Sequence, residues 1–348
     1  MNGLPPHRIW IDLSNSPHPL LFAPVSRALE ERGHTVLVTI RDHAQTMELA
    51  LSRWPGAEVI GGESPVGRAG KARALAGRVS ELYAWSRWER PDVALSHNSY
   101  AQIVAARATG VRVVTAMDFE HQPSNHLAFR LAHLVLLPDA IPAAAVRRQG
   151  ARASKVRRYA GLKESLYVGD FRPNPRIAEA LGIAVPEGGA LVVARTPPSG
   201  AIYHRFENHR FGDVLMAVCR QDHVRCVLLV RHPDQRRAVE ALALPNCTIP
   251  EQAVDARALI HEADLVIGAG GTMSREAALI GVPTLSLFAG TQPAVDRRLI
   301  ERGEMERFED LAQVTPVKRR AEPPHPVEEL RRSGEAVLEA FLEATLAG

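Results

Sequence analysis

The sequence predicts an α/β protein built from two Rossmann-like, doubly wound domains. Short runs of four to seven aliphatic residues alternate with helix-type patterns from end to end, which is typical of parallel sheets covered by helices on both faces. This alternation is interrupted once, near residue 165. The chain has 348 residues, which is the length of about two ordinary domains. Ligands of such sheets bind beyond the carboxyl ends of the strands, so we expect a site in a cleft between the domains.

The first series of elements gives the N-terminal domain. Its predicted strands span 8–13, 34–40, 57–62, 92–97, 111–117 and 134–138. The helices predicted between them span 19–33, 42–54, 68–90, 99–110 and 124–133. The first helix has Leu21, Val25 and Leu29 on one face, and Gly33 is placed to end it.

A second series of the same kind follows a predicted linker at 157–176, where glycine and proline interrupt both periods. Its strands are expected at 189–195, 224–231, 264–269 and 283–288, and its helices at 210–221, 234–244, 256–263, 272–281 and 292–303. We therefore expect domains at 1–165 and 166–325, and a last helix at 326–348 that crosses back to the first domain.

The composition narrows the class of protein. The net charge is +3 and no arginine–lysine block forms a nucleic-acid-binding arm, so we expect no nucleic-acid partner. The three cysteines form no CxxC pair, which favours a reducing cytoplasm. Residues 1–10 lack the apolar run of a signal peptide, and no segment reaches the roughly 18 apolar residues of a membrane span. A soluble protein, or one peripheral to the membrane, is expected.

The loop after the first strand is the first candidate site. Ser14, Asn15 and Ser16 are good helix caps that let another backbone approach, and Pro17 fixes the turn. His18 would then point into the cleft with a pKa suited to proton transfer near neutrality. The alternative is a capping turn that carries a surface histidine.

The loop after the strand at 264–269 is the second candidate. Gly268, Gly270 and Gly271 precede Thr272 and a helix, so backbone N–H groups and the helix N-terminus can approach a phosphate. Glu276, one turn into that helix, can accept hydrogen bonds from a ribose diol. The spacing fits neither the NAD fingerprint nor the P-loop. A glycine-rich turn before a helix with an exposed Glu–Arg pair is the alternative.

These residues resemble those of known families. His18, Pro24 and the segment from Leu29 to Val36 resemble the GT-B glycosyltransferase pattern of a first-strand loop followed by a helix ending in Arg-Gly-His-x-Val. The segment 91–114 resembles part of the undecaprenyl-linked N-acetylglucosaminyltransferase of cell-wall synthesis. The segment 263–287 is similar to the donor site of that enzyme and to the Ser-Gly-Gly-x-x-Glu-Glu segment of non-hydrolysing UDP-N-acetylglucosamine 2-epimerases.

Over nearly its full length, the chain most closely resembles a GT-B-like family catalogued as a domain of unknown function, DUF354. The "W-I-D-x-x-N-S-P-H" opening of that family matches Trp10 to His18, and its "Gly-Leu-Lys-Glu" linker matches Gly161 to Glu164. This resemblance implies the GT-B architecture, with an acceptor-side first domain and a nucleotide-sugar in the second domain.

The resemblance also implies roles for individual residues. His18 would be a general base or a group contacting the diphosphate, with Asp118 and Glu120 as the nearest candidates to orient it; the alternative for both acids is helix capping. Further substrate contacts are expected from Asn15, Ser16, Asn98, Arg195, Gly270, Gly271, Thr272, Glu276 and Gln292. Among these, Arg195 would be a diphosphate counter-ion, with a surface salt bridge as the alternative.

The implied activity is transfer of a sugar, carried by UDP, to an unidentified acceptor. Asp-x-Asp does not occur in the sequence, so we expect neither a metal ion nor another cofactor. An epimerase and a non-catalytic nucleotide-sugar binder remain alternatives. The epimerase acids are altered here to His97-Asn98 and Asp118-Phe119-Glu120, and the epimerase His-Arg-Arg-Glu-Asn segment is replaced by 194–204.

The helix predicted at 68–90 has a composition that is relevant to whether the protein contacts a membrane surface. It mixes Arg68, Lys71, Arg73 and Arg78 with aromatic residues at 83, 85 and 88. Such a helix either covers a sheet with solvated charges or lies on an anionic membrane surface, which would suit a lipid-linked acceptor.

Overall fold

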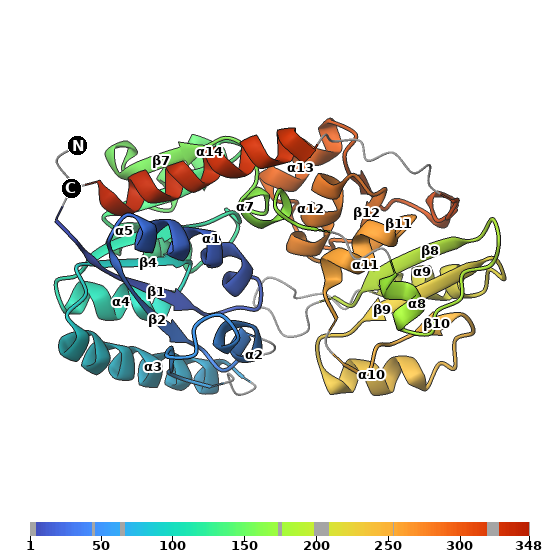
Figure 1. Cartoon of the computed structure of the whole chain (residues 1–348), viewed down its shortest axis with the longest axis horizontal. Coiled ribbons are helices and arrows are strands. Elements are labelled where there is room, and N and C mark those ends of the chain that lie inside the picture. Colours follow the sequence, from blue (N-terminus) through green and yellow to red (C-terminus); the bar gives the residue numbers. More distant parts are fainter. Residues whose placement is uncertain are drawn as a thin grey trace. The chain divides into compact units, whose positions relative to one another are not determined.

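The computed structural model describes residues 5–43, 46–62, 67–172, 176–197, 209–252, 254–318 and 327–347 (Figure 1). The chain divides into two compact units. Unit 1 comprises Met1–Tyr167 with Ser333–Gly348, and unit 2 comprises Val168–Arg332. Each unit holds a sheet in which every strand pairing is parallel, with helices between the strands. The predicted α/β class with two Rossmann-like units is confirmed.

The sheet of unit 1 has seven strands in the order β3-β2-β1-β4-β5-β6-β7. They are β1 (Arg8–Leu13), β2 (Thr35–Ile40), β3 (Glu58–Val59), β4 (Val93–His97), β5 (Arg112–Ala116), β6 (Leu134–Pro138) and β7 (Val156–Tyr159). The chain runs outward from β1 to β3 and then returns to β4 on the other side of β1. The loops after β1 and β4 therefore flank the point where the strand order reverses, which is where such sheets bind ligands.

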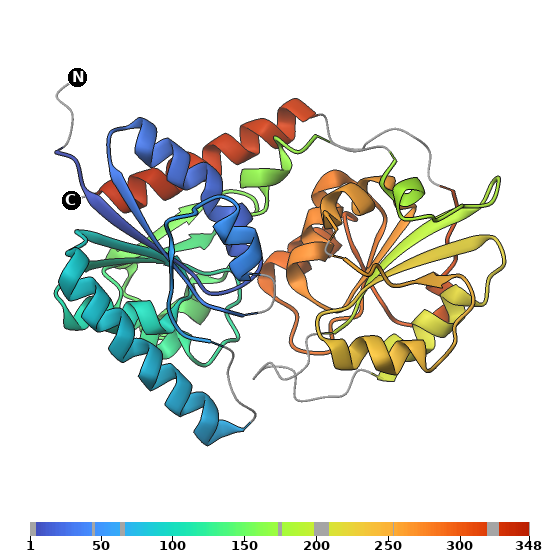
Figure 2. The same ribbon diagram turned by 60° about the horizontal axis from the view of Figure 1, so that its bottom comes forward.

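Helices cover both faces of this sheet. They are α1 (His18–Glu31), α2 (Thr46–Leu51), α3 (Arg68–Glu89), α4 (Tyr100–Ala108), α5 (Asn125–Leu131), α6 (Ala143–Arg148) and α7 (Ser165–Val168). The last helix, α14 (Val327–Leu346), joins α1 on one face, while α3 and α4 lie on the other (Figures 1 and 2). The ring of Phe341 on α14 lies 6.3 Å from that of Phe22 on α1 and 6.0 Å from that of Tyr159. The C-terminal half of α14 is thus part of the unit 1 core.

The sheet of unit 2 has six strands in the order β10-β9-β8-β11-β12-β13. They are β8 (Ala190–Arg195), β9 (Val224–Leu229), β10 (Cys247–Thr248), β11 (Leu265–Gly268), β12 (Thr284–Ser286) and β13 (Glu306–Arg307). Its helices are α8 (Ile177–Ala180), α9 (His209–Cys219), α10 (Pro233–Glu240), α11 (Ala256–Glu262), α12 (Gly271–Ile280) and α13 (Ala294–Glu301). The order reverses between β8 and β11, so the chain at Arg195 and the glycine loop after β11 flank the equivalent point.

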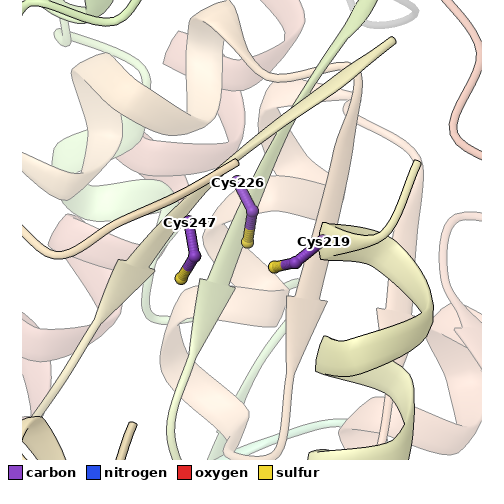
Figure 3. Close-up of side chains that lie close together, drawn as sticks. All are labelled: Cys219, Cys226 and Cys247. Carbon is purple, nitrogen blue, oxygen red and sulfur yellow. The ribbon is translucent and has the colours of Figure 1, made fainter. Parts of the chain in front are cut away.

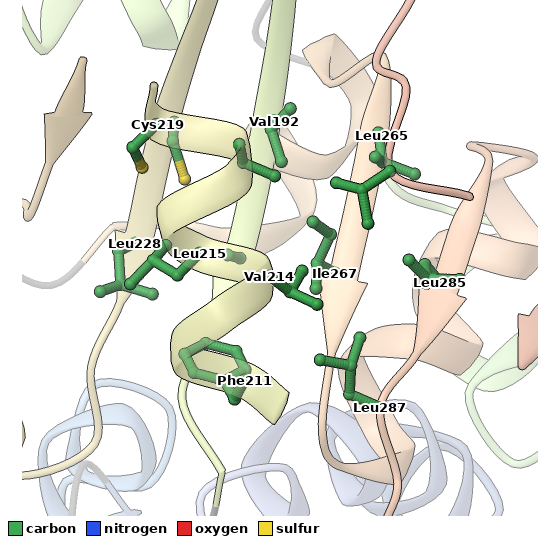
Figure 4. Packing of buried hydrophobic residues seen from close by; sticks show 14 of the residues in the cluster. Val192, Phe211, Val214, Leu215, Cys219, Leu228, Leu265, Ile267, Leu285 and Leu287 are labelled. Carbon is green, nitrogen blue, oxygen red and sulfur yellow. The ribbon is translucent and has the colours of Figure 1, made fainter. Parts of the chain in front are cut away.

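The core of unit 2 lies between α9 and the sheet (Figure 4). Phe211, Val214 and Leu215 of the helix are buried against Ile267 of β11 and Leu285 of β12. Each Å² of apolar surface that this packing removes from water stabilises the unit by roughly 25 cal/mol. The strands at this point read as continuous aliphatic runs because helices cover both of their faces.

Three local features differ from the sequence-based predictions: the start of the predicted linker, the N-terminal cap of α1 and the position of Arg78. The stretch 157–176 was predicted as linker, but it opens with β7; residues 173–175 of that stretch lie outside the described part. The side chains of Arg157 and Arg158 in β7 are exposed, so this edge strand lacked the apolar run that marks the others. The caps predicted for α1 are absent: its N-cap is Pro17, and no side chain caps it.

Arg78 differs from its predicted place on a solvated or membrane-facing surface. It is 6% exposed and donates to Asp12 Oδ1 at 2.7 Å and to the carbonyl of Ile60 at 2.9 Å. Asp12 is fully buried and also accepts from Thr39 Oγ1 at 2.5 Å and from Ser99 Oγ. A buried charge persists only when it is paired and hydrogen-bonded, so this network fixes α3 to the ends of β1 and β4. Within the described residues, no helix is both long enough and apolar enough to span a bilayer.

Candidate functional site

His18 begins α1, directly beyond the carboxyl end of β1, and its side chain is 3% exposed. A turn places it there, since the His18 N–H donates to the carbonyl of Asn15 at 2.9 Å. Its ring centroid lies 5.5 Å from that of His97, at the end of β4. The two imidazoles thus meet at the reversal point of the unit 1 sheet.

The protonation state of His18 follows from its surroundings. Burial lowers its pKa well below the usual value, and His97, Lys163 and Arg78 lower it further, while Asp118 acts in the opposite direction. The ring is therefore neutral near pH 7. Its Nδ1 accepts the backbone N–H of Ser14 at 3.1 Å. A neutral imidazole carries one proton, so Nε2 holds it and His18 presents an N–H donor.

His97 and Asp118 belong to a second group of side chains in unit 1. His97 Nε2 lies 3.4 Å from Asp118 Oδ1, and Lys163 Nζ donates to Asp118 Oδ2 at 2.5 Å. Lys163 also contacts Glu164 Oε1. The side chains of Lys163 and Glu164 are 4% and 1% exposed. Charges this deeply buried need partners, and the group offers a carboxylate held between an ammonium and an imidazole. Such a carboxylate can accept a proton from a substrate hydroxyl.

Asn98 follows His97 in the left-handed backbone region, with φ of 54°. Asparagine tolerates this region better than most residues. Its Nδ2 donates to Asn125 Oδ1 at 3.4 Å, while its own Oδ1 is buried without a hydrogen-bond partner among the described residues. Strained backbone and unsatisfied polar atoms are both found preferentially at functional sites.

The other predicted unit 1 residues lie as follows. Asn15 is exposed and Ser16 is half-buried, both in the turn before α1. Glu120 is buried, and its Oε1 lies 3.4 Å from His121 Nε2. The backbone carbonyl of Glu120 accepts from Gln149 Nε2 at 2.6 Å, which ties this loop to α6.

The neutral state of His18 predicts how stability depends on pH. The unfolded chain binds a proton at His18 near pH 6.5, while the folded chain does so only at lower pH. Stability contributed by this site is complete above the unfolded pKa and is lost as the pH falls below it, by at most about 1.4 kcal/mol per pH unit. Urea denaturation is measured at pH 7.5 and at pH 5.5. Between these pH values the free energy of unfolding should fall less for His18→Gln than for the wild type.

Fluorescence isolates unit 1 in this experiment, because all four tryptophans lie at positions 10, 54, 85 and 88. His126→Gln is a matched control, since its ring is at the surface of the same unit. If the free energy of unfolding falls equally in the wild type and in His18→Gln between pH 7.5 and pH 5.5, His18 is not a buried neutral group.

Arg195 ends β8, at the reversal point of the unit 2 sheet. Its Nε is buried and has no hydrogen-bond partner among the described residues. Burial lowers the pKa of Arg195, and the carboxylate of Glu276 acts in the opposite direction. Arginine stays protonated in proteins, so Arg195 is a cation near the carboxylate of Glu276, and its Nε–H is a hydrogen-bond donor without an acceptor among the described residues. A buried unsatisfied donor costs about 1–3 kcal/mol, which an anionic ligand would offset.

The glycine loop lies between β11 and α12. Gly270 is the N-cap of α12 and has no side chain to cap the first N–H groups. A Cβ at Gly270 would come 3.1 Å from Arg231 Nη2, and one at Gly271 would come 3.0 Å from Arg275 Nη2. The glycines therefore let two guanidinium groups approach the helix start. Thr272, in the first turn, is half-buried.

Two glutamines complete this part of unit 2. Gln292 is 9% exposed, and both polar atoms of its amide are buried without a partner among the described residues. Gln235 instead is fully engaged: its Oε1 accepts from Thr196 Oγ1 at 2.7 Å and from the Arg231 N–H at 2.9 Å, and its Nε2 donates to the carbonyl of Pro197 at 2.8 Å. Gln235 therefore braces the ends of β8 and β9, whereas the amide of Gln292 has no such hydrogen bonds among the described residues.

Sequence reasoning did not assign roles to His97, Lys163, Glu164 or Arg231 in the site. Each follows a strand end or lies in the "Gly-Leu-Lys-Glu" stretch, and polar residues at a strand end were the available signal. Residues 198–204 of the replaced segment 194–204 lie outside the described residues.

Comparisons with known proteins support the fold. An uncharacterized protein of Methanocaldococcus jannaschii is 27% identical over 315 residues, covering 88% of this chain and 89% of that protein. The UDP-GlcNAc 2-epimerase of the same organism, solved with UDP-GlcNAc and UDP, has a TM-score of 0.70 at 14% identity, covering 96% of this chain and 99% of the other. Anabaena HepE, solved with UDP-glucose, has a TM-score of 0.59 at 17% identity, covering 97% and 92%.

At these identities the solved structures establish the fold alone, and the GT-B class implied by the sequence is confirmed in that sense. The family model described as "Protein of unknown function (DUF354)" matches residues 7–324, which is nearly the whole chain. The chain is therefore a member of the DUF354 family.

Proposed function

We propose that this protein is a glycosyltransferase that moves a sugar from a UDP-linked donor to an acceptor hydroxyl without a metal ion. The observation that carries this proposal is the buried, unsatisfied Nε of Arg195, beside Glu276 and next to the N-terminus of α12. A cation, uncapped helix N–H groups and a carboxylate suit a diphosphate and a ribose diol. The choice of UDP is supported by the UDP-sugars bound to the structural neighbours.

The sugar would meet the amide of Gln292, whose donor and acceptor atoms match sugar hydroxyls. In transfer, the acceptor oxygen attacks the anomeric carbon and the bond from that carbon to the diphosphate oxygen breaks. The acceptor proton passes to the carboxylate of Asp118, and the leaving diphosphate is stabilised by Arg195 and the α12 N-terminus. The Nε2–H of His18 donates a hydrogen bond to the diphosphate, which is the second of the two roles predicted for it.

An epimerase is the second candidate, and the acid–base group of unit 1 favours it. His97, Asp118 and Lys163 can move protons at a sugar carbon as well as at a hydroxyl. The transfer reaction leaves the acceptor open, and a lipid-linked acceptor is compatible with the 83% exposed Trp88 on α3.

One experiment separates the candidates. The full chain is incubated with a panel of UDP-sugars in D2O, with and without EDTA, and followed by proton NMR. Release of UDP with a sugar transferred to an added acceptor or to water supports the proposal. A UDP-sugar that keeps its diphosphate but takes up deuterium at C2 identifies an epimerase. Stoichiometric UDP-sugar binding with neither change would contradict both and indicate a non-catalytic binder.

A further inference from the structure

All three cysteines of the chain come together in unit 2, although they lie far apart in the sequence (Figure 3). Cys219 ends α9, Cys226 lies in β9 and Cys247 lies in β10. Their side chains lie close together, and the three Sγ atoms all lie within 4.8 Å of one another. The register pairs Cys247 directly with Cys226, and α9 packs over this pair.

This spacing is close to that of a metal–thiolate centre. Metal–thiolate bonds of about 2.3 Å place three sulfur atoms about 4 Å apart around one ion. Shifts of well under about 1 Å would therefore bring all three sulfurs into bonding distance, which rotation about the side-chain bonds can supply. Among the described residues, this is the one group of three or more histidine, cysteine or acidic side chains arranged to hold a metal ion.

The surroundings indicate which ion would bind. Zinc sites are almost always four-coordinate, but no fourth histidine, cysteine or acidic ligand of the described residues joins the group. The neighbours are aliphatic: the three cysteines pack with Val192, Val218 and Leu228. A soft ion satisfied by three thiolates, in the absence of water, fits this pocket better than zinc does, and Cu(I) is one of the soft ions that thiolates select.

A metal ion also has a path from the solvent to the three sulfur atoms. Cys219 and Cys226 are 0% and 1% exposed, whereas Cys247 is half-buried. Cys247 lies in β10, the edge strand of the sheet, which is only two residues long. An ion can therefore reach the group through Cys247 without opening the core.

We propose that Cys219, Cys226 and Cys247 form a thiolate site for one Cu(I) ion, separate from the residues assigned to the nucleotide-sugar. Each Cu–S bond replaces a thiol proton, which passes to the solvent. The ion would tie β9, β10 and α9 together at the edge of the unit 2 sheet.

The test is an anaerobic titration of the full chain with Cu(I) in competition with a chromophoric Cu(I) chelator. One ion per chain should bind, and Cys247→Ser should weaken the affinity by more than about 100-fold, since even the partners of metal ligands contribute 10–100-fold. Cys247 is chosen because it is the most accessible of the three, and circular dichroism checks that the variant folds. Met216→Leu, which removes another soft side chain from α9, should bind as the wild type does.

A second measurement does not depend on the variant. Alkylation of the wild type followed by mass spectrometry should show all three thiols protected by Cu(I) and not by Zn(II). Equal affinity in wild type and Cys247→Ser, or thiols that react equally with and without Cu(I), would overturn the proposal. In that case the three cysteines are simply packed in the core.

Discussion

Arg195→Ala should lower the affinity of the full chain for UDP by at least about 30-fold in a calorimetric titration. Removing one partner of a buried, hydrogen-bonded charge pair costs roughly 2–5 kcal/mol. Arg195 is a half-buried cation at the reversal point of the unit 2 sheet, and its buried Nε has no partner among the described residues. The diphosphate would be that partner.

A matched control comes from the same unit. The side chain of Arg237 on α10 is 72% exposed, so Arg237→Ala should leave UDP affinity within about twofold, as expected for a surface position. Glu276→Gln should weaken UDP more than it weakens inorganic diphosphate, because its proposed partner is the ribose. If Arg195→Ala binds UDP as tightly as the wild type does, the end of β8 is not part of the donor site.

Asp118→Asn should lower the rate of donor turnover by about 10²–10⁴-fold while leaving UDP affinity unchanged. The amide keeps the shape of the carboxylate but cannot take up the acceptor proton. Glu164 still accompanies Lys163 in the variant, so the buried ammonium keeps a counter-charge. Turnover is measured as UDP release, and affinity by the same titration as for Arg195.

Asp139→Asn is the control for this second experiment. Asp139 is an exposed aspartate directly after β6 in the same unit, so its variant should turn over at the wild-type rate. If Asp118→Asn retains full turnover, Asp118 is not the base and its pairing with Lys163 is structural. If it loses UDP affinity instead, Asp118 contacts the donor itself.

The parallel sheets could be predicted from sequence because their strands are continuous aliphatic runs. "RIWIDL" and "LVLLP" became β1 and β6 within a residue. β7 was missed because two of its four residues are exposed arginines, and β10 and β13 because two-residue strands carry no period. Edge strands depend on pairing with a neighbour, which a single segment of sequence does not reveal.

The candidate site was predictable to the extent that it lies in loops at strand ends. His18 and the glycine loop were selected as candidates by that rule, and Arg195 by the resemblance to known families. Lys163 was not, because it reaches Asp118 across 45 positions in the sequence. The role of a given atom was equally hidden: only the hydrogen bond from Ser14 shows which nitrogen of His18 accepts and which one donates.

The central claim is that the reversal point of the unit 2 sheet, at the ends of β8 and β11, binds the diphosphate of a nucleotide-sugar. A crystal structure of the full chain soaked with UDP tests it most directly. The account predicts the diphosphate within hydrogen-bond distance of Arg195 Nε and of the first N–H groups of α12, with the ribose hydroxyls on Glu276. UDP bound at any other place, with Arg195 Nε still unpartnered, would contradict it.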